Sequence, residues 1–209
     1  MSLRLTNVSV TLAGRPVLRG VSLHVAPGEV VSLEGASGAG KTTLVRAAAG
    51  LVAHGGQVAA AGTAVVFQQH ALARRLTART NVLVGTLGRV GLLRTALQAW
   101  PRAEVALAER CLDRVGLAAF GARRTDTLSG GERQRVAVAR ALAQRAPVLL
   151  ADEPVASLDP DNAAAVLGLL RDLARRDGLA VLLCLHQPEL ARRFADRRLR
   201  LVDGRAGPC

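Results

Sequence analysis

The sequence has no tyrosine, no isoleucine and a single lysine. Aromatic side chains make up only 2% of the chain, and they are Phe67, Phe120, Phe194 and Trp100. Because 50% of the residues are nevertheless hydrophobic, we expect a core of leucine, valine and alanine. The shortage of aromatic rings also excludes the stacking platforms with which many proteins hold single-stranded nucleic acids.

Cysteine is scarce as well. Cys111, Cys184 and Cys209 are odd in number and scattered, which is typical of reduced thiols in a cytoplasm and does not fit the spacing of a metal site. No run reaches the roughly 18 apolar residues of a membrane span, and the first residues alternate like a strand. We therefore expect neither a membrane span nor a signal peptide.

The net charge of +12 is carried by arginine, because every basic residue except Lys41 is an arginine. These arginines are dispersed and occur only in short pairs such as Arg74-Arg75 and Arg123-Arg124. That pattern favours solvated surfaces and an acidic protein or lipid partner, and we do not expect nucleic acid as the partner.

Several segments read as strands. Residues 3–12 and 17–25 alternate and predict an antiparallel pair joined by a turn at residues 14–16. Short apolar runs bounded by turn residues predict strands buried on both faces of a parallel sheet. These runs are residues 29–34, 63–67, 148–152 and 179–185.

Between Gln69 and Leu128 the pattern turns helical and rich in arginine, most clearly over residues 102–116. The length suits one domain, 1–209. The predicted fold class is therefore α/β, with a mixed or parallel sheet core, an N-terminal antiparallel part, and a helical subdomain inserted at about residues 70–140.

Residues 35–42, GASGAGKT, fit the P-loop pattern G-x-x-x-x-G-K-[ST] between a predicted strand and a helix predicted over residues 42–50. Glycines let backbone N–H groups curl around phosphate oxygens at the positive end of a helix. Lys41 would reach the β- and γ-phosphates, and the Thr42 hydroxyl would bind Mg²⁺. The compact ammonium fits inside such a loop, whereas a planar guanidinium does not.

A second helix start occurs at LSGGERQR, residues 128–135, where Ser129 can cap a helix that continues to residue 145. Gly130 and Gly131 at its entrance permit a second anion site. From the residues alone, an ordinary capped helix is an equal alternative.

Polar residues follow three of the buried strands. Asp152 and Glu153 end one, Gln68 another and His186 a third, so all reach the carboxyl edge of the sheet, where ligands bind. Two carboxylates beside a P-loop suit metal coordination and activation of a water. The alternative is a strand-ending turn with solvated acids.

With these residues placed, the chain resembles the nucleotide-binding subunit of ABC transporters over nearly its whole length. Six motifs match this family in order and spacing. They are the P-loop, Gln68 as the Q-loop, LSGGERQ as the signature, Asp152-Glu153 as the end of Walker B, Ser157-Leu158-Asp159 as the D-loop, and His186 as the switch histidine. Within the family, the sequence around these motifs is most similar to that of phosphonate importer ATPases.

The resemblance implies ATP and Mg²⁺ as cofactors and a head-to-tail homodimer in which each nucleotide is held by two copies. The implied nucleotide-binding residues are Gly35, Ala36, Ser37, Gly38, Ala39, Gly40, Lys41, Thr42 and Thr43 of one copy with Ser129, Gly130, Gly131 and Asp159 of the other. The implied catalytic residues are Glu153 as general base, His186, Lys41 and Gln68, and the implied metal residues are Thr42, Gln68 and Asp152.

The resemblance also implies a peripheral subunit on the cytoplasmic face of the cell membrane. Its partners would be transmembrane permease subunits, received by the arginine-rich residues 70–95, and indirectly a solute-binding protein. The rival interpretation is an ABC-type accessory ATPase of a soluble complex, acting with phosphonate-degrading enzymes or on nucleic acid.

Three features depart from the family pattern. Leu12 stands where an aromatic residue usually stacks on adenine, so we expect weaker or less base-selective nucleotide binding. Glu34 precedes the P-loop where an apolar residue is usual, and the sequence offers no physical reason for it. The chain ends at DGRAGPC, so we expect no appended regulatory domain.

Overall fold

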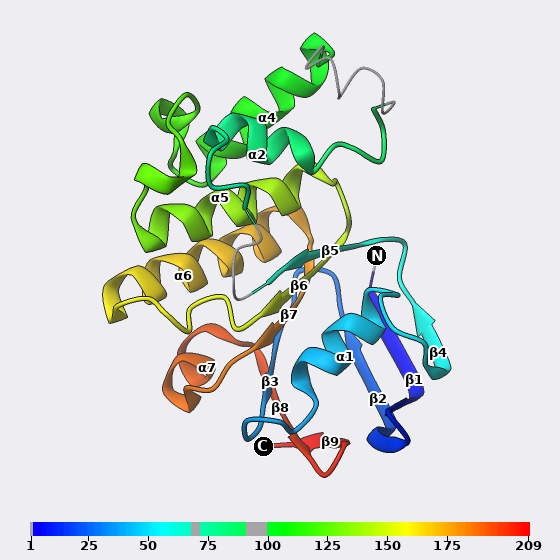
Figure 1. The fold of residues 1–209 in the computed structure, drawn as a ribbon. Coiled ribbons are helices and arrows are strands. Elements are labelled where there is room, and N and C mark those ends of the chain that lie inside the picture. The colour runs from blue at the N-terminus through cyan, green and yellow to red at the C-terminus, as the bar shows by residue number, and fades with distance from the viewer. Residues whose placement is uncertain (1, 68–71, 91–99) are drawn as a thin grey trace. The chain divides into compact units, whose positions relative to one another are not determined.

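The computed structural model describes residues 2–67, 72–90 and 100–209 (Figure 1). The chain divides into an α/β unit, Met1–Gln68 with Ala146–Cys209, and a helical unit, Gln69–Arg145. The sequence placed the helical insertion at about residues 70–140.

The centre of the α/β unit is a six-stranded sheet in the order β5-β6-β7-β3-β8-β9, in which only the β8–β9 pair is antiparallel. Its strands are β3 (Val30–Glu34), β5 (Thr63–Val66), β6 (Val148–Asp152), β7 (Ala180–Cys184), β8 (Arg197–Val202) and β9 (Arg205–Pro208). Every residue of β3, β6 and β7 is buried, as the apolar runs predict for central parallel strands. The predicted α/β class with a parallel core is confirmed.

A second, antiparallel sheet has the order β2-β1-β4 and is built from β1 (Leu3–Leu12), β2 (Arg15–Val25) and β4 (Gly55–Ala59). The predicted turn at residues 14–16 is wrong by one to two residues. Leu12 pairs with Arg15, and Ala13 and Gly14 form the turn with φ values of 48° and 75°. Two successive positive φ angles are typical of a tight hairpin turn. Pro16 lies within β2, which tolerates it as an edge strand.

Three helices complete the α/β unit, α1 (Lys41–Ala48), α6 (Pro160–Asp177) and α7 (Pro188–Phe194). Helix α6 starts with Asp159 as its N-cap and Pro160 in its first turn, and it ends at Gly178, whose φ of 68° suits glycine. Across both units, the buried core consists mainly of leucine, valine and alanine with the cysteines Cys111 and Cys184, and among the described residues Phe194 is its one aromatic member. This agrees with the expected composition of the core.

The helical unit contains α2 (Ala78–Val84), α4 (Arg102–Arg114) and α5 (Gly130–Ala143), with short 3₁₀ turns at Ala118–Phe120 and Thr125–Thr127. Helices α4 and α5 match the two helices that the sequence predicted here. The buried Asn81 holds the segment before α2, since its side chain accepts from Ala73 N at 2.8 Å and donates to Ala73 O at 3.1 Å. Within the described ranges, no helix combines the length and the apolar character that crossing a bilayer requires.

Candidate nucleotide site

The P-loop connects β3 to α1 (Figure 1), and the side chain of Lys41 at the start of α1 folds back onto this loop. Lys41 is only 4% exposed, and its Nζ donates to the carbonyl oxygens of Gly35 at 2.8 Å and Ala36 at 3.0 Å. The ammonium therefore sits inside the loop, where it can move between these carbonyls and an incoming anion.

Glycine is required in this loop for close packing. Gly40, the N-cap of α1, has a φ of 103°, and a Cβ there would approach Val17 and Leu18 of β2 to within 3.1–3.3 Å. A Cβ on Gly35 would lie 2.7 Å from the carbonyl oxygen of Leu201 on β8. The cradle is thus packed directly against two strands.

Asp152 lies beside the start of α1, and one of its carboxylate oxygens has no hydrogen-bond partner. The residue is 5% exposed, its carboxylate accepts a hydrogen bond from the Thr42 side chain, and its Oδ1 atom is buried with no hydrogen-bond partner. Burial raises the pKa of the Asp152 carboxyl above its ordinary value, and the Thr42 hydrogen bond opposes that rise. A buried, unpartnered oxygen next to a hydroxyl fits a hydrated divalent cation.

Glu153 and His186 form a pair at the ends of β6 and β7. His186 Nε2 is hydrogen-bonded to Glu153 Oε1, and Glu153 N donates to Cys184 O at 3.2 Å. Glu153 has a φ of 50°, which is strained for a residue other than glycine and turns the side chain out of the strand direction.

A small cavity of about 130 Å³ adjoins this pair and is lined by Glu153, Val155, Ala156 and residues 184–187. It offers room for water next to the Glu153 carboxylate. Burial raises the pKa of the Cys184 thiol in its wall well above the ordinary value, so the thiol is neutral there.

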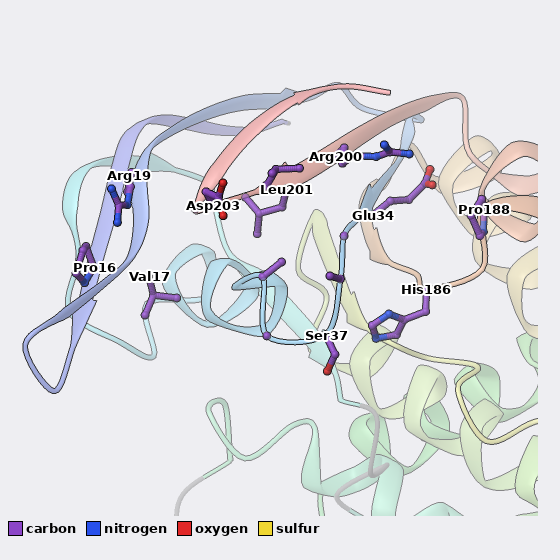
Figure 2. A pocket seen from close by; sticks show the side chains of 16 residues that line it. Pro16, Val17, Arg19, Glu34, Ser37, His186, Pro188, Arg200, Leu201 and Asp203 are labelled. Atoms are coloured by element: carbon purple, nitrogen blue, oxygen red, sulfur yellow. The ribbon is translucent and has the colours of Figure 1, made fainter.

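A larger cavity of about 1040 Å³ lies along the flank of the P-loop (Figure 2). Residues 35–39 and His186 line it together with Pro16, Val17 and Arg19 of β2 and residues 200–204. Its volume matches ligand sites in general, and its charged walls include Arg19, Arg200 and Asp203.

The signature residues belong to the helical unit. Ser129 is the N-cap of α5 and forms a capping box, in which its Oγ accepts from Glu132 N at 3.2 Å and Glu132 Oε2 accepts from Ser129 N at 2.6 Å. Ser129 is exposed, Gly130 half-buried and Gly131 buried. The helix tip is therefore rigid and accessible at Ser129.

Asp159 is exposed and caps α6. Its Oδ1 accepts from Asn162 N at 3.0 Å and its Oδ2 from Asn162 Nδ2 at 2.7 Å, and the backbone hydrogen bond lowers the pKa of the Asp159 carboxyl. The charged, exposed side chain of Asp159 is thus held in one orientation at the start of α6.

The structure brings Lys41, Thr42, Asp152, Glu153 and His186 into one unit at the end of the parallel strands. Thr43 lies half-buried in the first turn of α1. Gln68 lies outside the described residues.

Sequence reasoning missed the partner of Glu34. The Glu34 carboxylate, 5% exposed, is bound by Arg198 of β8. A prediction of residues 197–202, RRLRLV, as a strand next to β3 would have suggested this contact. Segments rich in arginine, however, are rarely predicted as strands.

Comparison with known proteins shows the family. The ABC transporter family model matches residues 18–156. A "Phosphonates import ATP-binding protein PhnC" of Frankia casuarinae is 50% identical, and the alignment covers 88% of this chain and 80% of the relative. A "Phosphite import ATP-binding protein PxtA" of Stutzerimonas stutzeri is 46% identical, with 96% and 79% covered.

Solved structures agree in fold. The ATP-binding cassette MJ0796, in a dimeric post-hydrolysis state with ADP and Pi, aligns with a TM-score of 0.80 at 30% identity over 99% of this chain and 98% of that one. An inward-facing, putative metal-chelate type ABC transporter aligns with a TM-score of 0.88 at 25% identity over 99% and 82%.

Proposed function

Because the chain belongs to the ABC transporter family and is an ABC-type transport ATPase, we propose that it energises a membrane importer of phosphonate, phosphite or a related oxyanion. The observation that carries the nucleotide site is Lys41, buried and held by two carbonyls inside its own glycine loop. The solute class comes from the relatives' names. The transported solute would be bound by other subunits.

ATP would bind with its phosphates in the cradle of residues 35–43. Backbone N–H groups and the start of α1 would donate to the phosphate oxygens, and Lys41 would leave the Gly35 and Ala36 carbonyls for the β- and γ-phosphates. Exchange of two neutral carbonyl acceptors for anionic phosphate oxygens is favourable because the ammonium then also gains the attraction of an opposite charge.

Asp152 and Thr42 fit a magnesium ion, since the Asp152 Oδ1 atom is buried without a partner beside the Thr42 hydroxyl. Thr42 would hold the ion directly, Asp152 through water, and Gln68 is proposed as a third ligand. Bound Mg²⁺ supplies charge neutralisation at the β- and γ-phosphates. Ionised Asp152, disfavoured by burial alone, would then gain its missing partner.

Glu153 would take the proton of the attacking water, which the small cavity at its carboxylate can hold. His186, bound to Glu153 in this structure, would turn toward the γ-phosphate and orient that water.

Two copies would complete each site head to tail. Ser129, Gly130 and Gly131 of one copy would close over the nucleotide in the P-loop of the other, and Asp159 would reach across beside that P-loop. The exposed Ser129 and the fixed, exposed Asp159 support this assignment. A dimeric cassette among the structural neighbours supports it as well.

The remaining partners are permease subunits and, through them, a solute-binding protein, which places the chain at the cytoplasmic face of the cell membrane. The described part of residues 70–95 would receive a cytoplasmic helix of the permease. The relatives named as import proteins favour this role over the rival of an accessory ATPase in a soluble complex. Adjacent reading frames separate the two, because permease genes support import and lyase genes support the rival.

The test is Glu153→Gln, a change that keeps the shape of the side chain and removes its basicity. We expect ATP to bind normally while hydrolysis falls at least about 100-fold, the scale of a lost general base, and a nucleotide-bound dimer to accumulate. Gel filtration with ATP and phosphate release measure both. A normal rate of ATP hydrolysis by this variant would show that Glu153 is not the general base.

A further inference from the structure

We propose that Glu34 is a positioning residue of the nucleotide site, whose ion pair with Arg198 holds the start of the P-loop against β8. This inference rests on the proposed nucleotide binding and concerns a residue with no role assigned so far. Glu34 is the last residue of β3, and Gly35, the first residue of the P-loop, follows it directly.

The contact is a partly buried ion pair with two parallel hydrogen bonds. Arg198 Nε donates to Glu34 Oε1 at 2.7 Å and Arg198 Nη2 donates to Oε2 at 3.0 Å, while the two side chains are 27% and 5% exposed. Arg200 extends toward the same carboxylate (Figure 2), and the Cys209 thiol lies 3.7 Å from Oε1. Bidentate pairs fix direction as well as distance.

The next residue is held by the same strand. Gly35 lies so close to the Leu201 carbonyl that a Cβ would be 2.7 Å from its oxygen. In register, Leu33 lies opposite Leu199 and Glu34 opposite Arg200. Strand β8 therefore supports the chain at residues 33, 34 and 35 in succession, where the P-loop begins.

The backbone next to Glu34 contacts Lys41 directly. The Gly35 carbonyl that follows Glu34 accepts a hydrogen bond from Lys41 Nζ at 2.8 Å, as does the Ala36 carbonyl at 3.0 Å. The Glu34–Arg198 pair thus fixes the loop segment whose carbonyl oxygens hold the Lys41 ammonium before phosphate binds. A loop held in its binding shape before the ligand arrives loses less entropy on binding.

Pre-organisation of this kind acts on binding and not on the chemical step. The phosphate cradle contacts the nucleotide both before and during hydrolysis, so weakening its support raises KM and leaves kcat nearly unchanged. Loss of a residue that acts on the reacting atoms would instead lower kcat. This difference separates a positioning role from a catalytic one.

The experiment uses the full chain with Glu34→Gln, Arg198→Gln and both changes together. We expect each single change to raise the Kd for ATP, measured calorimetrically in EDTA, about tenfold, with kcat at saturating MgATP within about twofold of wild type. The double variant should bind ATP no more weakly than the singles, because both changes remove one contact. Arg198→Gln also covers the case in which Glu34→Gln does not fold.

A matched control lies at the other end of the same two strands. Glu29, just before β3, pairs with Arg197 at the start of β8, with Nε 2.9 Å from Oε1. Glu29→Gln should leave the ATP Kd at the wild-type value, because this pair is remote from the loop.

Two results would overturn the positioning role while the proposed function stands. One is wild-type ATP affinity in the folded Glu34 and Arg198 variants, and the other is an equal loss of affinity in Glu29→Gln. If the wild-type chain itself bound no ATP, the proposed function would fail, and the positioning role with it.

Discussion

At the scale of single residues, Lys41 shows why one lysine persists in a chain whose other cations are arginines. Its Nζ donates to two carbonyl oxygens of a loop that packs against β2 and β8, and a wider head group would have to displace these contacts. Guanidinium is planar and presents a rigid fork of donors, whereas ammonium is compact and can turn toward another acceptor. On exposed surfaces this difference matters little.

Lys41→Arg should therefore abolish tight ATP binding although the charge is kept. We expect the Kd for ATP to rise at least about tenfold and the folded chain to lose about 1–3 kcal/mol from overpacking. Calorimetric titration and thermal unfolding measure the two effects. The control is Arg46→Lys at an exposed position of the same helix, which should change neither. Near-normal ATP affinity of the arginine variant would contradict this account.

Leu12 leads to a prediction on base selectivity. It is 44% exposed at the end of β1, where an aliphatic side chain offers adenine no ring to stack on. We expect ATP and GTP affinities of similar size, and Leu12→Tyr should strengthen ATP binding by about 1–3 kcal/mol, the value of one stacked base. Competition between the two nucleotides checks this. A strong ATP preference of the wild-type chain would show that the base is recognised elsewhere.

At the scale of elements, the sequence predicted the strands that are buried on both faces and the two N-terminal strands that alternate between buried and exposed residues. Runs such as VLLAD in β6 and AVLLC in β7 contain almost only apolar residues, so their burial followed directly. Strand β4, GGQVA, lies at the edge of the antiparallel sheet, and strand β8, RRLRLV, lies between β3 and β9. Both were missed because runs rich in glycine or arginine lack the apolar pattern of a strand. The motif residues at strand ends were predictable, and Arg198 as the partner of Glu34 was not.

The contact between Arg198 of β8 and Glu34 makes the stability of the fold depend on pH. The Arg198 guanidinium holds the pKa of the Glu34 carboxyl below its ordinary value, with help from Arg200. A lowered carboxyl pKa stabilises the fold above the unfolded-state value, and that contribution is lost as pH falls through the folded-state pKa. The Cys209 thiol is neutral over this acidic range, because the ordinary pKa of a thiol lies far above it and desolvation raises the pKa of Cys209 further.

Glu34→Gln should consequently cost about 2 kcal/mol of unfolding free energy at neutral pH, and the gap to wild type should narrow below about pH 4.5. Urea unfolding at a series of pH values measures it. The exposed Arg79–Glu109 pair is the comparison, for which Glu109→Gln should change stability by at most about 0.5 kcal/mol. A gap that stays constant with pH would show that the charge of Glu34 is not what stabilises the fold.

At the scale of the whole molecule, each chain has one P-loop and one signature helix, carried by different units. If both act on one nucleotide through the pairing of two copies, activity is a property of the dimer. ATPase rate per chain should then rise with protein concentration until dimers dominate. A flat rate is expected only where the dimer persists at the lowest concentration tested, which gel filtration can establish.

Mixing two inactive variants tests the head-to-tail pairing itself. Lys41→Ala removes the P-loop ammonium, and Ser129→Arg places a bulky cation at the signature helix tip, so each homodimer should be inactive. In a mixed dimer one site contains both defects, while the other combines an intact P-loop with an intact signature. Mixing should therefore restore part of the wild-type rate. If each copy used its own signature helix, both chains of the mixture would remain inactive, and no recovery would be seen at any ratio.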